Sequence, residues 1–325
     1  MSLKNKLTVQ KEIFLLNQHN KQDFLNILGQ ELTKANITVK HAIGDADLLI
    51  VQTALDIAKE NTVTVIGEDT DLLILLLYHK STKSMPVYLT GEEKSSMKSK
   101  PKIWDIQYAK EKLGDDLCNS LLAVHALLGC DTTSRIHGVG KATAFQKFKA
   151  NDEFRFLIKT LSSDSGTKAD ILAAGERLLL MLTGGVREKT LDELRYSQCT
   201  RKLGTSKKAL SPKMLGPTSD AASLHVMLVY YQIQTWKGRT DLQLSEWGWI
   251  VKNNFVLPVP MTKPPGPSNI LKVIRCSCQG DCAGRCTCHS LGIKCTSMCS
   301  TCRGVSCSNC DESPDNFENN DENDD

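Results

Sequence analysis

The clearest pattern in the first half of the chain is a β-branched run, Val63–Ile66, that ends in an acidic turn and is followed by an apolar run at 72–77. A short apolar stretch bounded by a turn is typical of a buried strand in a parallel sheet. Polar residues in open α/β folds gather at the carboxyl ends of such strands. We therefore expect a strand–turn–helix unit that carries Asp69 and Asp71 at the edge of a sheet.

The other apolar positions follow mostly helical spacing, with two further short β-branched stretches. Helices are expected at 22–35, from 44 to about 60, across 104–128, and at 142–149, 154–161, 169–182 and 223–236; strands are expected at 37–39 and 86–90. Asp105 is placed to cap the helical region that begins at Trp104. Residues 198–217 are basic and predict a turn-rich connection. The fold class expected from this order is α/β.

Composition shifts divide the chain into six segments. Residues 1–36 form an N-terminal extension, 37–150 a sheet-containing core, 151–257 a helical extension, 258–275 a Pro-rich linker, 276–310 a cysteine-rich segment and 311–325 an acidic tail. The linker marks a domain boundary because prolines interrupt regular structure. The tail is too polar to fold by itself.

The net charge of +3 hides an uneven distribution. Because the last fifteen residues are acidic, the body of the chain before them is clearly basic, which suits a polyanionic partner. No secretory signal and no apolar run long enough to span a bilayer is evident, so no membrane partner is expected. Nothing in the pattern fixes an oligomeric state.

Three separate segments end in aspartates. They carry Asp45 with Asp47, Asp69 with Asp71, and Asp131. Hydrolysis of a phosphodiester by two metal ions needs a set of oxygen ligands of this kind, because two hard cations roughly 4 Å apart can hold the attacking and the leaving oxygen. The alternative is structural: acidic residues are favoured at helix starts and in turns.

A glycine turn follows Asp131 in the sequence. Gly138, Val139 and Gly140 place two glycines around one apolar residue, directly before the expected start of a helix. Without side chains in the way, backbone N–H groups can approach a phosphate, and Lys141 adds a positive charge for the same partner. An ordinary helix–helix turn is the alternative interpretation.

The order of these motifs resembles that of PIN-like nucleases of the flap endonuclease/XPG type. The motifs are Gly44–Asp47, then 67–73, then 128–131 with 136–144. The resemblance implies a PIN-like parallel sheet flanked by helices over 37–150, with a helix–two-turn–helix element that grips the DNA backbone. It also implies that Asp45, Asp47, Asp69, Asp71 and Asp131 bind two Mg²⁺ or Mn²⁺ ions for cleavage.

Two departures separate the chain from that family. Asp45 and Asp47 stand where the family usually has a glutamate, and 1–36 shows no apolar strand that ends in an aspartate ligand. Either the nuclease domain is N-terminally incomplete, or the domain binds without cutting. We therefore expect a metal-dependent nuclease acting on DNA or RNA, or else a non-catalytic nucleic-acid-binding protein derived from a mobile element.

The C-terminal segment is dense in cysteine. Its cysteines are Cys276, Cys278, Cys282, Cys286, Cys288, Cys295, Cys299, Cys302, Cys307 and Cys310. A segment this short has almost no apolar core, so a bound metal must supply the folding free energy. Thiolates bind Zn²⁺ tetrahedrally, and nine shared thiolates can hold three ions. Without a secretory signal, this density predicts a zinc cluster rather than disulfides.

The cysteine spacing is similar to that of the CXC domains of tesmin/TSO1-type DNA-binding proteins. Both have two Cys-x-Cys pairs, and six residues follow the second pair before the next cysteine. Arg285 stands where that family places a DNA-contacting tyrosine. Together, the two resemblances imply Zn²⁺ in this segment, nucleic acid as partner with DNA preferred to RNA, and a nuclear location.

Several aromatic and histidine residues are expected to pack rather than bind a ligand. They are Trp236, Trp247 and Trp249, together with His79, His125 and His137 on or beside apolar helices.

Overall fold

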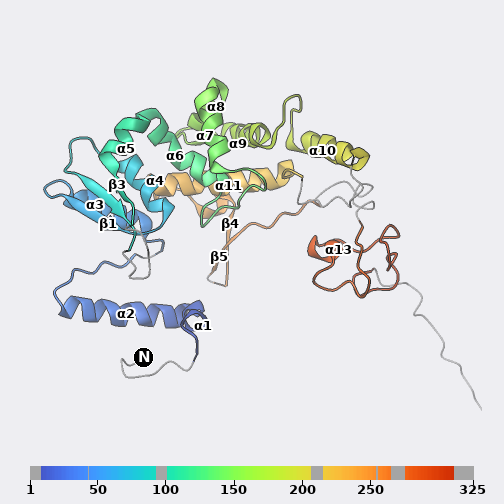
Figure 1. The fold of residues 1–325 in the computed structure, drawn as a ribbon, viewed down its shortest axis with the longest axis horizontal. Helices are drawn as coiled ribbons and strands as arrows, with labels where there is room; N and C mark the ends of the chain where they lie inside the picture. The colour runs from blue at the N-terminus through green and yellow to red at the C-terminus, as the bar shows by residue number, and fades with distance from the viewer. Residues whose placement is uncertain are drawn as a thin grey trace, which may run out of the picture. The chain divides into compact units, whose positions relative to one another are not determined.

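The computed structural model describes residues 9–42, 44–92, 101–205, 215–253, 255–264 and 275–310 (Figure 1). The chain divides into two units, Met1–Thr53 and Ala54–Asp325. The described residues are mostly helical, with a small sheet and a cysteine-rich segment. The acidic tail predicted at 311–325 lies outside the described residues.

The first unit contains helices α1 (Lys11–Leu16) and α2 (Gln18–Lys34) and the beginning of α3 (Asp47–Ile57). Asn17 caps α2 because its side chain accepts hydrogen bonds from the backbone N–H groups of His19 and Asn20. The helix predicted at 22–35 is thus confirmed and begins earlier. The strand predicted at 37–39 is wrong: these residues have no regular structure, and so short a run is a strand only where a neighbour pairs with its backbone.

The second unit carries a three-stranded sheet in the order β1–β2–β3. Strand β1 (Val63–Ile66) pairs in parallel with β2 (Val87–Thr90), and β2 pairs antiparallel with β3 (Ile103–Asp105). Helix α4 (Thr70–His79) forms the crossover between the two parallel strands. The strand–turn–helix prediction is therefore confirmed, but β1 is an edge strand, with Val65 buried and Ile66 67% exposed. One parallel pair beside an antiparallel strand does not confirm a PIN-like sheet.

Trp104 lies in β3 and not in a helix, which corrects the prediction for this region. Asp105 nevertheless caps the next helix as expected, because its Oδ1 accepts from the backbone N–H of Tyr108 at 2.9 Å. That helix is α5 (Ile106–Leu113), and Gly114, at φ +81°, separates it from α6 (Asp115–Leu128). A glycine interrupts the region here because other residues rarely adopt a positive φ.

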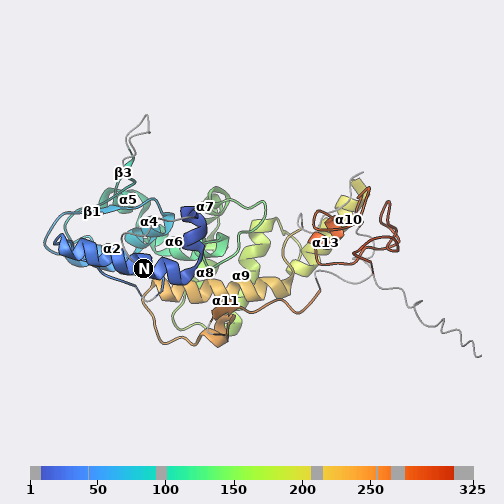
Figure 2. The same cartoon turned by 90° about the horizontal axis from the view of Figure 1, so that it is seen from below.

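The remaining helices pack in sequence on one another and on α6, with the last of them lying along one side (Figure 2). They are α7 (Lys141–Ala150), α8 (Asp152–Leu161), α9 (Lys168–Thr183), α10 (Leu191–Thr205) and α11 (Ser219–Trp236). Helix α11 packs against both α6 and α9. The predicted helices at 142–149, 154–161, 169–182 and 223–236 are confirmed. The predicted turn-rich stretch from 198 is helical up to Thr205, where α10 ends.

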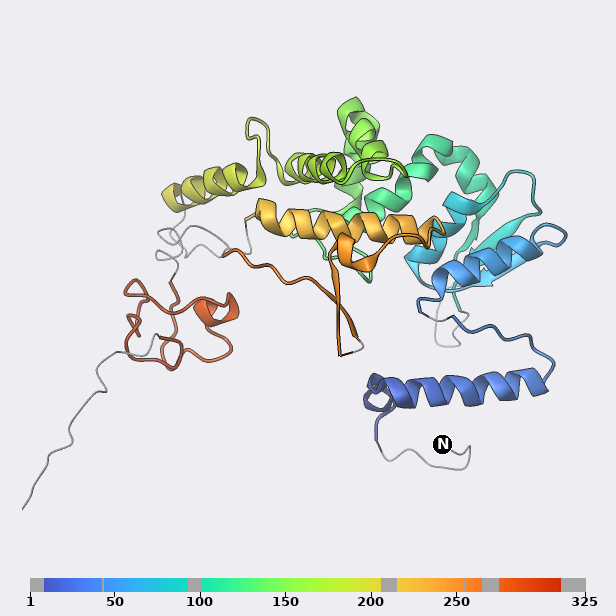
Figure 3. The same ribbon diagram turned by 180° about the vertical axis from the view of Figure 1, so that it is seen from behind.

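A short 3₁₀ helix, Leu244–Trp247, follows α11 and leads into an antiparallel hairpin of β4 (Trp249–Lys252) and β5 (Phe255–Pro258) (Figure 3). Trp247 is buried against Tyr230, with ring centroids 4.1 Å apart, and Trp236 is 2% exposed. Both therefore pack in the core, as predicted. None of the helices in the described part of the chain combines the length and apolar character needed to cross a bilayer.

Gly175 allows α9 and α11 to pack closely. A Cβ atom at Gly175 would lie 2.3 Å from Cγ2 of Val226. We expect Gly175→Ala to destabilise the protein by about 1–3 kcal/mol although alanine favours helices, because overpacking outweighs propensity. The measurement is the urea midpoint of the helical circular-dichroism signal. The double variant Gly175→Ala with Val226→Ala should lose less stability than the sum of the losses in the two single variants, because Val226→Ala removes the methyl groups that the new Cβ would meet. A loss equal to that sum would contradict this packing.

Candidate metal centre

The cysteine-rich segment has thiols where a domain of ordinary composition has aliphatic side chains. Between 275 and 310 the regular structure described is one short helix, α13 (Thr287–Ser290). The buried residues that pack together are Cys276, Cys282, Cys286, Cys288, Cys295, Cys299 and Cys302. Gly304, at φ +72°, lies against the backbone of Cys295 and Thr296, so the chain folds back closely on itself there. This small core consists mainly of sulfur atoms.

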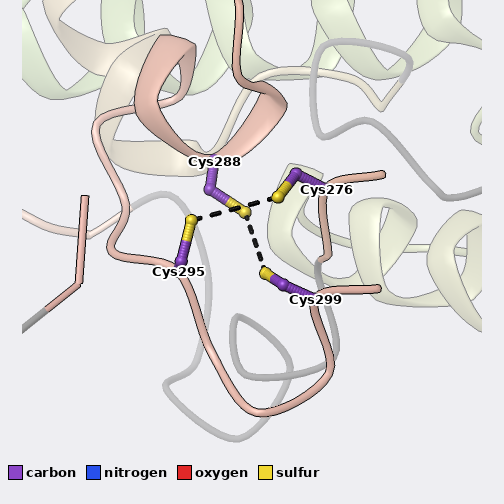
Figure 4. Close-up of side chains that lie close together, drawn as sticks. All are labelled: Cys276, Cys288, Cys295 and Cys299. Carbon is purple, nitrogen blue, oxygen red and sulfur yellow. Dashed lines mark hydrogen bonds between the residues drawn. The ribbon is translucent and has the colours of Figure 1, made fainter. Parts of the chain in front are cut away.

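The thiols converge in three groups of four, within each of which all Sγ atoms lie within 4.8 Å of one another. The first group is Cys276, Cys288, Cys295 and Cys299, whose side chains point toward one another from separate stretches of chain (Figure 4). The second is Cys276, Cys282, Cys295 and Cys302, and the third is Cys276, Cys278, Cys282 and Cys286. Four thiols at such distances fit the tetrahedral coordination of Zn²⁺, so the cluster can hold a metal ion.

The last two cysteines differ from each other. Cys307 is partly buried and packs against the cluster. Neither Cys307 nor Cys310 belongs to the three groups, and Sγ of Cys310 donates to the backbone oxygen of Cys307 at 2.8 Å. The metal-ligand role predicted for Cys310 stays a prediction, and its observed hydrogen bond is to the backbone.

Burial and neighbouring hydrogen-bond donors give these thiols widely different pKa values. Burial raises the pKa of Cys276 to about 11 and that of Cys288 to about 12. Burial also opposes ionisation of Cys299, but backbone N–H donors and thiol neighbours outweigh it and lower the pKa of Cys299 to about 7. A metal ion binds thiolates, so each ion that binds must displace protons from the less acidic members.

Asn309 links the end of the segment to the cluster. Its Nδ2 donates to the backbone oxygen of Ile293 at 2.9 Å and to Sγ of Cys295 at 3.5 Å, and its own backbone oxygen accepts from the N–H of Cys295 at 2.8 Å. Asp281 has a similar role, since Oδ1 accepts from the N–H groups of Cys282 and Ser308. Sequence analysis missed both residues, because cysteine spacing does not reveal which neighbours orient the ligands.

We expect Asn309→Asp to weaken zinc binding about 10–100-fold, because it replaces a donor to the Cys295 sulfur with a negative charge. Competition with a chromophoric chelator measures the change. Ser297→Asp adds the same charge at an exposed site of the segment and should have a much smaller effect. Equal losses in the two variants would show that only the added charge matters.

The predicted aspartate ligands lie on both units, and the structure shows a local role for each pair. In the first unit, Oδ1 of Asp45 accepts from the backbone N–H of Asp47 at 3.2 Å, at the start of α3. In the second, Asp69 caps α4, since Oδ1 accepts from the N–H of Asp71 at 2.9 Å. Asp131 is exposed in the turn after α6. Among the described residues, the ligand groups with atoms within 4.8 Å are all cysteines.

Asp71 is buried, 7% exposed, and its Oδ1 accepts from Nε2 of His125 at 2.6 Å. His125 is itself 4% exposed and packs beside Trp236. The prediction that His125 is a satisfied core histidine is confirmed. His79 is satisfied in the same way by the backbone oxygen of Trp236, at 2.7 Å, whereas His137 is exposed. A metal ion at Asp71 would have to share its carboxylate with this imidazole.

Two conservative substitutions separate the structural roles of the Asp69–Asp71 pair. In metal-free buffer, we expect Asp71→Asn to lower stability by about 1–3 kcal/mol, because it removes a buried charged partner of His125. Asp69→Asn should cost little, because asparagine caps a helix as well as aspartate does. Urea denaturation measures both. An unchanged free energy of unfolding in Asp71→Asn would show that the contact with His125 contributes little to folding.

The glycine turn has the local form that was predicted. After α6 the chain makes a turn at Asp131–Thr132 and a second at His137–Gly138 before α7 begins at Lys141. Gly138 has φ +75° and open space around it, Val139 donates its N–H to the oxygen of Ile136, and Gly140 precedes the helix. Lys141 is exposed. The role of these residues in nucleic-acid binding stays a prediction.

Comparison of the chain with models of known protein families, with curated proteins and with solved structures finds no match.

Proposed function

We propose that this protein binds nucleic acid, with DNA as its preferred partner, through the turn and helix between Thr132 and Ala150, and that a three-ion zinc cluster folds its C-terminal segment. The observation that carries the proposal is the charge of this turn and helix. The stretch contains Arg135, Lys141, Lys147 and Lys149 and not one acidic residue. Phosphate backbones are bound chiefly by such unopposed cations.

The shape of this element supports the same role. Ala144 and Phe148 are buried and anchor α7, so that Lys141 and Lys149 remain on its exposed side. The exposed backbone at Gly138 and the first N–H groups of α7 add partial positive charge next to these side chains. The arrangement therefore offers both charge and backbone donors to a phosphate.

The three groups of thiols support a specific arrangement of zinc. Cys276, Cys282 and Cys295 each belong to at least two groups, so these three would bridge pairs of ions. Each ion would then complete its shell with two terminal thiolates. The terminal pairs would be Cys288 with Cys299 and Cys278 with Cys286. Cys302 of the second group would take Cys307, which packs against the cluster, as its terminal partner.

Charge balance suggests that the zinc segment is not the main phosphate contact. Three Zn²⁺ ions on nine thiolates carry three negative charges. In 275–310, the basic residues Arg275, Arg285, Lys294 and Arg303 outnumber the single acid, Asp281, by the same amount. The loaded segment would be close to neutral, so most of the attraction to phosphate would come from Thr132–Ala150. A nuclear location and descent from a mobile element are part of the same proposal.

Elemental analysis of protein purified under reducing conditions tests the zinc part. We expect about three zinc ions per chain, because nine thiolates with three bridges hold three tetrahedral ions. Cys310→Ser should keep the full content, whereas Cys276→Ser, at a residue shared by all three groups, should lower it. Loss of zinc in Cys310→Ser would assign that thiol to the cluster and contradict the arrangement.

Fluorescence anisotropy with a labelled oligonucleotide tests the binding part. Lys141→Gln with Lys149→Gln should weaken binding and lower the slope of log K against log [salt] by about 2, because each lost phosphate contact removes about one counterion. Lys83→Gln removes an exposed lysine of the same unit outside the stretch and should leave the slope unchanged. An unchanged slope in the double variant would place the phosphate contacts elsewhere.

A metal-dependent nuclease is the second candidate, favoured by one observation. Asp69 is exposed at the carboxyl end of β1, a strand in a parallel pair, where catalytic groups of α/β folds gather. The test is cleavage of flapped and single-stranded DNA with Mg²⁺ or Mn²⁺. Activity that disappears in Asp69→Asn while binding persists would support this candidate, whereas cleavage unchanged in that variant would exclude the aspartate site.

A further inference from the structure

A cavity of about 250 Å³ lies between the loop that follows α6 and the beginning of α11. Ser134 to His137 line one side, and Pro217, Ala221 and His225 line the other. Its volume is near the lower end of the ~300–1,000 Å³ typical of ligand sites, so it has room for a single small ring system. Of the residues proposed to bind phosphate, Arg135 lines this cavity, and none of the cluster thiols does.

The loop side of this cavity is held rigidly. Gly129, at φ +109°, lets the backbone of Arg135 approach so closely that a Cβ at Gly129 would lie 2.9 Å from Cα of Arg135. Oγ1 of Thr133 donates to the oxygen of Ala126 at 2.7 Å, and Oγ1 of Thr132 donates to Oε1 of Gln232 on α11, also at 2.7 Å. The loop is thus tied to α6 by one hydrogen bond and to α11 by another.

The cavity has apolar walls and one cationic side chain, Arg135, at its edge. Ile136, Leu179 and Ala222 contribute apolar surface, and Arg135 and His137 are exposed beside them. Among the described residues that line the cavity, none is acidic. An apolar ring that carries an anionic group suits this combination better than a neutral or cationic ligand.

His225 adds a specific polar group to the wall. Its Nε2 donates to the backbone oxygen of Leu127 at 2.9 Å, and burial lowers the pKa of this imidazole. The ring is therefore neutral at pH 7, with Nδ1 left as an acceptor, for which no partner is recorded among the described residues. Because His225 lines the cavity, an acceptor on its ring favours a ligand with an N–H donor.

We propose that this cavity binds one unpaired nucleobase of a single strand whose phosphates lie along Thr132–Ala150. The inference rests on the proposed function, because Ser134–His137 line the cavity and also belong to the phosphate-binding segment Thr132–Ala150. A base supplies a flat apolar ring and N–H donors, and its phosphate supplies the charge for Arg135. Double-stranded DNA has no free base to offer, so the site distinguishes single strands from duplexes.

Binding of three DNAs of equal length, with the same label, to the full-length protein tests the proposal. They are a single strand, the same strand with abasic residues throughout, and the matching duplex. We expect the single strand to bind about tenfold more tightly than the abasic chain, because only the base can enter the cavity. Ala221→Leu fills the cavity and should abolish this difference. Ala169→Leu makes the same change in the first turn of α9, outside the cavity, and should preserve the difference in affinity.

A single-stranded DNA carrying 5-iodo-deoxyuridine gives a measurement that needs no variant. Photo-crosslinks to peptides containing His137 or His225 are expected, and crosslinks found only elsewhere would overturn the proposal. Equal binding of normal and abasic strands would overturn the cavity assignment but leave the proposed function standing. Failure of all three DNAs to bind would remove both. Loss of the crosslink when a nucleoside 5′-monophosphate is added before irradiation, at the same concentration as the DNA strand, would assign the cavity to a free nucleotide and overturn the proposal.

Discussion

Close packing of α11 against α6 and α9 is the constraint on which the second unit depends. Gly175 removes the side chain that would keep α9 and α11 apart, and Val226 fills the space. Polar side chains on α11 then reach its neighbours: His225 bonds to Leu127, Gln232 to Thr132, and the end of the helix accepts from His79. These contacts fix the loop after α6, and that loop carries the basic stretch and one wall of the cavity. The proposed binding surface therefore depends on the packing of α11 against α6 and α9.

The cysteine-rich segment is organised by different physics. It has almost no aliphatic side chains to bury, and close-packed sulfur atoms that can hold a metal ion form its core. Asn309 and Asp281 provide hydrogen bonds that hold the ends of the segment and orient Cys295 and Cys282. A bound metal ion would therefore couple folding to binding in this segment, whereas the helical body has an apolar core of its own.

The acidic residues illustrate how one residue type serves several purposes. Asp69 and Asp45 accept backbone N–H groups at helix starts, which requires only a short acceptor in the right place. Asp71 is buried against His125, so its charge is stabilised by a partner inside the protein. These roles explain the acidic turns without a metal ion. They also explain why paired aspartates alone are weak evidence for a nuclease.

The sequence by itself determined the local structure: the apolar spacing of α6, α8, α9 and α11, the strand–turn–helix unit from Val63, the cap at Asp105 and the clustering of cysteines. These features depend on neighbours within a few residues, which is the range over which helical periodicity, capping and turn chemistry act. Tertiary structure alone decided that Asp71 meets His125, fifty-four positions away, that Cys276, Cys282 and Cys295 are shared between groups while Cys310 is not, and that a cavity lies beside the basic loop. Such contacts are set by the packing of elements distant in sequence, and no local pattern encodes which side chains that packing brings together.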